Sequence, residues 1–484
     1  MSHPHFDLAA AARQAMTERG FEPQFPPAAA QQLDQLRQNP PHPSPSARDL
    51  RSLLWSSIDN DTSRDLDQIE YVEALPSGGH RVLIGIADVD AFVPKGSPID
   101  QHAMRETTTV YSGVENFSMI PEELSTGLTS LLEGEERAAV VVEFTVDAQA
   151  NIAASDVYLA RVVNRAQLAY PSTGAWLAGG AAPPKVASSA DLQQQLRLQD
   201  EIAQRLRGQR YNHGALNLLT IETHPIHIAD GTIDIEAEVK NRATQLIEDF
   251  MIAANGVVAR AFDAAHRSSI RRVVKTPKRW DRIVTLAAGL GTKLPATPDP
   301  KPLHDFLCEQ QAKDPDHFAD LSLAIIKLLG PGEYVLEKPG QPSEGHFGLA
   351  VQDYTHSTAP NRRYADLVSQ RLLKAMIAKQ PSPYSDDELS AIAAQCTRME
   401  DAERKVSREM QKRIAAVAMS NRIGQAFDAI VTGVTEHGSF VRTIQPHVEG
   451  MLVRGQQGLD VGDKLRVTLV HTDPVRGFID FARA

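Results

Sequence analysis

The stretch SIDNDTSRDLDQIE, residues 57–70, is the most informative segment of the chain. It holds five carboxylates and one glutamine, and only Ile58, Leu66 and Ile69 are candidates for burial. Carboxylates this close repel one another by several kcal/mol in a partly buried site unless a cation neutralises them. Their hard oxygens select Mg²⁺, Mn²⁺ or Ca²⁺. The stretch therefore predicts a divalent-cation site, and a solvated acidic loop is the alternative if it is taken alone.

Two kinds of cation site are compatible with this spacing. The first is an EF-hand calcium loop, whose ligand positions would be filled by Asp59, Asp61, Ser63, Asp67 and Glu70. Against it, Arg64 stands where the sharp turn of that loop requires glycine, and a strand pattern rather than a helix follows Glu70. The second is a phosphoryl-transfer site, in which carboxylates hold Mg²⁺ ions that bridge a scissile phosphate and activate water. We favour the second.

Composition narrows the class of protein. The chain has 484 residues, 42% of them hydrophobic and 23% charged, which predicts a globular protein of roughly two to four domains. Cys308 and Cys396 lack metal or redox spacing, and no signal peptide or long apolar run occurs, so we expect a cytoplasmic protein without membrane segments. The absence of a glycine-rich phosphate loop, a Rossmann fingerprint or a nucleophile elbow predicts no organic cofactor.

The pattern along the chain predicts a multidomain α+β protein. Residues 1–48 have helical spacing of apolar side chains and predict a small helical domain. Strands and helices mix over residues 49–380, and residues 381–422 are purely helical. Residues 423–484 carry five short β-rich runs separated by turn residues, which is typical of a small closed barrel.

Several local elements are well marked. HRVLIGIADVDAFV reads as a buried strand, and the helix after it starts at the capping residue Ser97. Asp230-Gly231 is the predicted turn of a hairpin. Ser385 and Glu388 form the capping box of a long helix.

Basic and aromatic residues suggest a partner that carries phosphates. The net charge of −11 argues against an enveloping nucleic-acid surface, but residues 267–282 hold seven basic residues against one acid. That segment is either the wall of a phosphate-binding channel or a solvated helix end. Arg362 and Arg363 stand beside Tyr364 and could fork onto phosphates while the ring stacks on a base, and Tyr111 adds a second aromatic.

These motifs together resemble the ribonuclease II/R family of 3′-to-5′ exoribonucleases. Its catalytic RNB domain typically reads T-I-D-x-x-x-(x)-x-D-x-D-D and then I-A-D-V, and this chain has SIDNDTSRDLDQ followed by IADVDAFVPKGSPIDQHAMRETTTVY. The blocks PEELSTGLTSL, LIEDFMIAAN and STAPNRRYADLVSQRLLKAMI follow in the family's order, and the final barrel is similar to an OB-fold RNA-binding domain of the S1 kind. The resemblance identifies residues 49–380 as the catalytic domain and residues 381–422 as its helical extension.

The resemblance implies a processive Mg²⁺-dependent exoribonuclease, with Mn²⁺ as a substitute ion, that converts single-stranded RNA to nucleoside 5′-monophosphates. No obligate protein partner is implied. The expected catalytic residues are Asp59, Asp65, Asp67 and Arg362. The expected metal ligands are Asp59, Asp65, Asp67 and Gln68. The expected RNA contacts are Tyr111, Glu248, Arg362, Arg363, Tyr364 and Phe440.

Three departures from the family pattern leave alternatives open. Gln68 replaces the fourth aspartate, so we expect weaker metal binding, and an RNA-binding protein that has lost hydrolysis is the first rival; a calcium-binding module is the second. The 48 residues before the catalytic domain are too few for the two cold-shock domains of the family, and we expect a helical, perhaps helix-turn-helix, substitute. In the barrel, His437 is a modest substitute for an aromatic; Phe440 is the better candidate to stack on bases, unless it lies in the barrel core.

Overall fold

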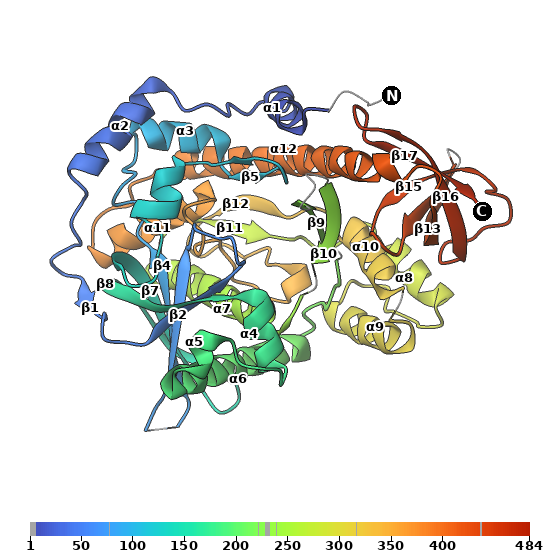
Figure 1. Ribbon diagram of the computed structural model, residues 1–484. Helices are drawn as coiled ribbons and strands as arrows, with labels where there is room; N and C mark the ends of the chain where they lie inside the picture. Colours follow the sequence, from blue (N-terminus) through green and yellow to red (C-terminus); the bar gives the residue numbers. More distant parts are fainter. Residues whose placement is uncertain are drawn as a thin grey trace.

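A central β-sheet carries the first half of the chain in the computed structural model, which describes residues 6–76, 78–220, 222–227, 233–238, 240–315, 317–435 and 438–484 (Figure 1). Its strands are β1 (Arg48–Asp49), β2 (Trp55–Asp59), β3 (Gln68–Ala74), β4 (His80–Ala87), β7 (Glu136–Val146) and β8 (Ile152–Ala169). They lie in the order β1-β8-β2-β3-β4-β7, and β8 also pairs with β7. The sheet therefore curls back on itself.

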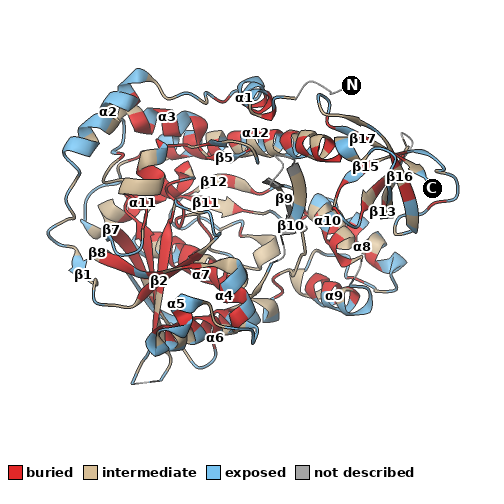
Figure 2. Ribbon diagram, in the orientation of Figure 1, coloured by how far each residue is buried: buried red, intermediate tan, exposed pale blue. Residues whose placement is uncertain are grey.

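Helices pack on this sheet and bury it. They are α4 (Tyr170–Leu177), α5 (Pro184–Ala187), α6 (Ala190–Asn212) and α7 (Arg242–Ala264). Figure 2 shows the strands as mostly buried and the outer sides of these helices as exposed. The predicted buried strand is β4, and the apolar face of α7 includes Leu246, Ile247 and Phe250, so both predictions are confirmed.

The next group of elements consists of helices, strands and turns outside the central sheet. They are α3 (Pro98–Glu106), β5 (Val110–Tyr111), β6 (Asn116–Phe117), a π-turn (Leu124–Leu128), β11 (Ser269–Val273), β12 (Glu333–Glu337), a 3-10 turn (Phe347–Leu349) and α11 (Tyr364–Ile377). The side chain of Ser97 accepts a hydrogen bond from the amide of Asp100, which confirms the predicted cap of α3. The hairpin is also present as β9 (Glu222–His227) and β10 (Ile233–Glu238), although its predicted turn at Asp230-Gly231 lies outside the described residues.

A helix of 34 residues, α12 (Asp386–Met419), runs along the molecule from α11 to the C-terminal barrel (Figure 1). The capping box of Ser385 and Glu388 starts it as predicted. Cys396 is 3% exposed and packs with the apolar core. A separate cluster of apolar side chains joins α8 (Trp280–Gly289), α9 (Pro300–Lys313) and α10 (Phe318–Leu329).

The two N-terminal helices do not pair in the manner of a helix-turn-helix. Helix α1 (Leu8–Glu18) packs on α12 through side chains such as Met16, and α2 (Pro27–Gln38) packs on α3. The amide of Glu22 between them donates to Glu106 (2.9 Å). Their apolar side chains join the cores of the rest of the chain, so residues 8–38 lie across α12 and α3; we call this segment the N-terminal strap.

The C-terminal segment forms the predicted closed barrel. Its strands are β13 (Ala426–Thr435), β14 (Gly438–Thr443), β15 (Glu449–Arg454), β16 (Lys464–Asp473) and β17 (Phe478–Arg483), after a 3-10 turn (Ser420–Arg422). Arg442 on its surface pairs with Asp320 of α10 (2.7 Å). No helix among the described residues is long and apolar enough to cross a membrane.

Candidate active site

The loop between β2 and β3 carries the predicted acidic residues. The two strands pair at Ser56 and Glu70, and the chain between them passes through Asp59, Asp65 and Asp67. Strands rather than helices flank the loop, and Glu70 is fully buried inside β3. The calcium-loop prediction is therefore wrong, because an EF-hand needs two helices and an accessible last ligand.

Asp59 ends β2 with its side chain turned into the loop. Its Oδ1 accepts hydrogen bonds from the amide of Asn60 (2.7 Å) and the hydroxyl of Ser63 (2.9 Å). Burial raises the pKa of the Asp59 carboxyl, although these two hydrogen bonds oppose the effect.

Asp67 is joined to a segment far away in the sequence. It is 2% exposed, its Oδ1 accepts a hydrogen bond from the amide of Asn361, 294 residues further on (3.1 Å), and its Oδ2 lies 3.4 Å from Nε of Arg362. Burial raises the pKa of Asp67 to about 7, although the charge of Arg362 opposes the effect. The predicted aspartate and the predicted arginine thus lie together.

Tyr111 lies over the same loop. Its hydroxyl donates a hydrogen bond to Oδ2 of Asp65 (3.0 Å), and the residue is 44% exposed. Burial of the hydroxyl, helped by the charge of Asp65, raises the pKa of Tyr111. The ring is therefore anchored at its polar end and presents an aromatic surface beside the aspartates.

Backbone contacts hold the arginine loop in place. The carbonyl of Arg362 accepts from the amide of Thr109 (3.0 Å), and the amide of Tyr364 donates to the carbonyl of Thr107 (2.8 Å). The amide of Ala359 donates to the side chain of Asp366 (2.8 Å). These bonds fasten the loop to the segment that carries Tyr111 and leave the guanidinium of Arg362 45% exposed.

Two expected RNA contacts are contradicted. The guanidinium of Arg363 is bound to Asp366 in the first turn of α11 (2.7 Å). Tyr364 is 1% exposed, and its hydroxyl donates to Asp100 of α3 (3.0 Å). Arg363 and Tyr364 therefore anchor the loop: the ring of Tyr364 is too buried to stack on a base, and the charge of Arg363 is already paired with Asp366.

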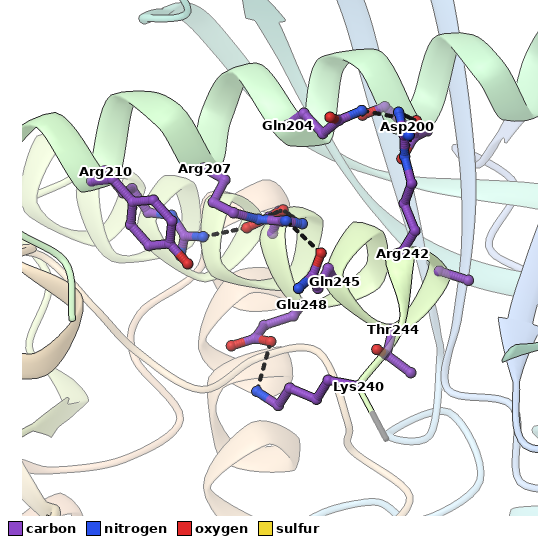
Figure 3. Close-up of polar contacts among 12 residues, drawn as sticks. Asp200, Gln204, Arg207, Arg210, Lys240, Arg242, Thr244, Gln245 and Glu248 are labelled. Carbon is purple, nitrogen blue, oxygen red and sulfur yellow. Dashed lines mark hydrogen bonds and ion pairs between the residues drawn. The ribbon is translucent and has the colours of Figure 1, made fainter. Parts of the chain in front are cut away.

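Glu248 lies on the exposed side of α7. Figure 3 shows its carboxylate turned to Lys240, and the ion pair between them measures 3.0 Å. Arg207 and Arg210 of α6 bind the neighbouring Asp249. Within the described part of the chain, Glu248 makes no hydrogen bond or ion pair with the aspartates or with Arg362. The structure thus does not bring Glu248 into the site.

Three of the seven basic residues at 267–282 are neutralised by acids from other elements. Arg271 is 1% exposed and pairs with Asp263 and Glu337, Arg272 pairs with Glu400, and Lys275 pairs with Glu333 and Glu344. The predicted open basic wall is therefore wrong for these three residues.

Phe440 lies on the outer face of the barrel. Its neighbours Ser439 and Val441 are buried, and Val441 belongs to the barrel core, whereas Phe440 is half-buried. The alternative that Phe440 fills the core is wrong, and its position is compatible with stacking. His437 lies outside the described residues.

Open space lies beside Tyr111. A cavity of about 500 Å³ is bounded by the acidic loop at Thr62, by the turn after β5, by the β9–β10 hairpin and by Gln411 and Ile414 of α12. Cavities of this size hold nucleotide-sized ligands. Chain segments from four parts of the sequence therefore enclose room for a nucleotide next to Asp65.

Oxygen donors dominate the site, which suits a hard cation. Gln68 is 8% exposed, and Glu70 is buried with both carboxylate oxygens lacking a hydrogen-bond donor among the described residues. No three His, Cys, Asp or Glu side chains in the described part converge closely enough to enclose a metal on their own. Mg²⁺ keeps several waters and uses substrate phosphate oxygens, so few protein ligands are enough.

The catalytic site predicted from the sequence left out two residues. Asn361 supports Asp67 through its backbone amide, and Glu70 adds a buried acid behind the loop. Both residues lie in segments that the sequence analysis identified. A hydrogen bond donated by a backbone amide, as at Asn361, cannot be predicted from the type of side chain. The alternation of β3, which places Gln68 and Glu70 on one face, was the available signal for Glu70.

Comparison with known proteins gives two family matches. Residues 47–379 match the RNB domain, and residues 425–484 match the C-terminal S1 domain of RNase II-type exonucleases. Ribonuclease R of Thermotoga maritima is 29% identical over 470 residues, which cover 90% of this chain and 64% of that protein. The chain spans only about half the length of other curated ribonuclease R sequences.

Solved structures share the fold. Mycoplasma genitalium RNase R in complex with ribose methylated single-stranded RNA has a TM-score of 0.86 at 23% identity, over 99% of this chain and 78% of that chain. Yeast Ssd1, described as a pseudonuclease, has a TM-score of 0.72 at 18% identity, over 93% of this chain and 56% of that chain. The fold alone therefore does not distinguish an active nuclease from an inactive one.

Proposed function

Since the chain belongs to the RNB-domain family of RNase R/II exoribonucleases, with a C-terminal S1 domain, we propose that it is a processive 3′-to-5′ exoribonuclease. In this proposal it hydrolyses single-stranded RNA to nucleoside 5′-monophosphates. One observation carries the proposal: Asp67, Asp65, Tyr111 and Arg362 lie together although the sequence separates them widely.

Arg362 is the group that meets the scissile phosphate. Its guanidinium is held by Asp67 from one side and remains 45% exposed, so it can donate to phosphoryl oxygens. Charge builds up on those oxygens in the transition state, and a fixed cation stabilises that charge more than it stabilises the bound substrate. Tyr111 stacks on the terminal base while its hydroxyl stays on Asp65.

Asp59, Asp65 and Asp67, with the amide oxygen of Gln68, are the residues that would hold Mg²⁺ or Mn²⁺. A bound ion of this kind lowers the pKa of a coordinated water and withdraws charge from the phosphate. Two features of the loop suit such a group: burial desolvates Asp59 and Asp67, and the hydrogen bonds to Asp59 both go to Oδ1. Phe440 on the barrel adds a second stacking surface for the incoming strand.

A degradation assay tests the proposal. Poly(A) labelled at the 5′ end is incubated with the purified chain and Mg²⁺, with EDTA as the control, and the products are separated by size and identified. A 3′-to-5′ exonuclease releases 5′-monophosphates while the labelled strand shortens from its far end. Internal fragments, or nucleotides with 3′-phosphates, would contradict the proposal.

The second candidate function is an RNA-binding protein without hydrolysis. Gln68 at the fourth acidic position, together with the lack of a converging group of three acids in the described part, favours it. It predicts that poly(A) is bound tightly and stays intact in Mg²⁺ and in Mn²⁺. Release of mononucleotides eliminates this candidate.

A further inference from the structure

Glu70 is a buried acid for which the fold supplies no partner. It is 0% exposed, and neither of its carboxylate oxygens accepts a hydrogen bond from the part of the chain that the structure describes. A buried polar group without a donor opposes folding, and an apolar side chain of similar volume would pack better at such a position. Packing therefore does not explain an acid at position 70.

Glu70 lies directly behind Gln68. Successive residues of a strand point to opposite faces, so Gln68 and Glu70 share one face of β3 and Ile69 takes the other. Across the sheet, Glu70 stands opposite Ser56 of β2, the strand that ends at Asp59.

Other polar groups surround Glu70 under the sheet. Nε2 of Gln199 on α6 donates to the hydroxyl of Ser56 (3.1 Å) and to the backbone carbonyl of Glu70 (3.3 Å). The other side-chain atom of that amide, Oε1, also lacks a partner among the described residues. The next strand is apolar at the same level, where Ile84 and then Val142 follow. Polar side chains of α6 thus meet the sheet beside Glu70.

We propose that the carboxylate of Glu70 acts on the divalent cation bound at Asp59 and supplies the negative charge that Gln68 lacks. Glu70 is then a positioning residue of the cation site, since it touches no substrate. This role explains why Glu70 is buried without hydrogen-bond donors from the protein, because the bound cation or one of its waters is then the partner of the carboxylate. This inference rests on the proposed function, which requires a cation at the acidic loop.

Binding of Mn²⁺ to the metal-free full chain, in the absence of RNA, tests the inference. Electron paramagnetic resonance counts the free ion during a titration. Glu70→Gln keeps the size of the side chain and removes its charge, and we expect it to weaken Mn²⁺ binding by about 10- to 100-fold. Glu73→Gln is the matched control, because Glu73 lies on the same strand but pairs with Arg81 near the surface. We expect it to change the affinity by less than about twofold.

A rescue variant separates the cation role from misfolding. Gln68→Asp added to Glu70→Gln returns an acid to the same face of β3, and we expect Mn²⁺ affinity to recover towards the parental value. Thermal melting without metal shows whether each variant is folded, and Glu70→Gln should melt no lower than the parent.

The outcomes distinguish the inference from the proposed function. Parental Mn²⁺ affinity in Glu70→Gln, or a loss that Gln68→Asp does not repair, overturns the role of Glu70 and leaves the exoribonuclease proposal in place. An absence of Mn²⁺ binding by the parent chain also overturns it. If the parent binds Mn²⁺ but releases no nucleotides from RNA, the proposed activity fails and the role of Glu70 is still decided by the titration.

Discussion

In the acidic loop, Asp67 accepts its hydrogen bond from Asn361, 294 residues away, whereas every strand of the barrel pairs with another strand of the segment between Ala426 and Arg483. In the loop, Asp67 is shielded from water and faces Arg362. The barrel buries apolar side chains and leaves aromatic and aliphatic ones such as Phe440 and Phe478 outside. We expect the acidic loop to determine the rate of hydrolysis and the barrel to determine the affinity for RNA. Substitutions in the two regions should therefore have separable effects on kcat and on the dissociation constant.

The largest effect is expected from Arg363→Ala, which breaks the anchor of the site rather than the site itself. Asp366 is 0% exposed on its side chain, and removing Arg363 takes away the ion-pair partner of this buried charge and leaves the amide of Ala359 as a donor. We expect a loss of about 3–5 kcal/mol in the free energy of unfolding, measured by denaturant titration.

The matched control is Lys301→Ala, which removes an exposed pair with Asp305 and should cost less than about 1 kcal/mol. Equal stability of the two variants would mean that the arginine loop does not depend on its buried pair.

Arg362→Ala should separate catalysis from binding. The guanidinium is 45% exposed, so in the proposed mechanism its loss removes stabilisation of transition-state charge while the fold stays intact. We expect kcat for poly(A) to fall by about 10²–10³-fold and the dissociation constant to change little. A fall in affinity as large as the fall in kcat would assign Arg362 to binding and remove the difference between the two regions.

Phe440→Ala is the corresponding change in the barrel. Stacking of a base on an aromatic ring contributes about 1–3 kcal/mol, so the dissociation constant for RNA should rise accordingly while kcat at saturating RNA is unchanged. Val461→Ala, another exposed position in the barrel, serves as the control and should leave affinity at the parental value. If Phe440→Ala lowers kcat instead, the barrel contributes to the chemical step.

The contact between the N-terminal strap and α3 should make the free energy of unfolding depend on pH, independently of the acidic loop and the barrel. Burial raises the pKa of Glu106, which accepts the amide of Glu22, to about 7. The native state therefore holds this proton to a higher pH than the unfolded chain does, so stability is greatest below the usual carboxyl pKa and falls as the pH rises towards 7. We expect a fall of about 2 kcal/mol between pH 5 and pH 7 from this group.

Melting temperatures of the parent and of Glu106→Gln at these two pH values measure that fall. The variant cannot ionise at this position, so its melting temperature should drop less between the two pH values. Parallel curves would show that Glu106 ionises in the folded chain as readily as in the unfolded chain.

Local sequence patterns predicted the helices and strands. The expectation that residues far apart in the sequence form one site came from the resemblance to a known family. The strand β4, the capped helices α3 and α12 and the barrel follow from periodicity and capping within short windows, and all are confirmed. Arg363 and Tyr364 were misassigned because Asp366 and Asp100 decide where they point, and Asp100 is far away in sequence. Within the basic segment, Arg271, Arg272 and Lys275 were misassigned for the same reason, since their neutralising acids come from β12, α12 and other segments.

The most direct measurement compares Asp67→Asn with the parent on labelled poly(A), following both the dissociation constant and the release of mononucleotides in Mg²⁺. Asparagine keeps the size of the side chain and an acceptor for the amide of Asn361, but removes the charge that faces Arg362. The account predicts parental RNA affinity with release of 5′-monophosphates abolished. Release at the parental rate by Asp67→Asn would contradict it.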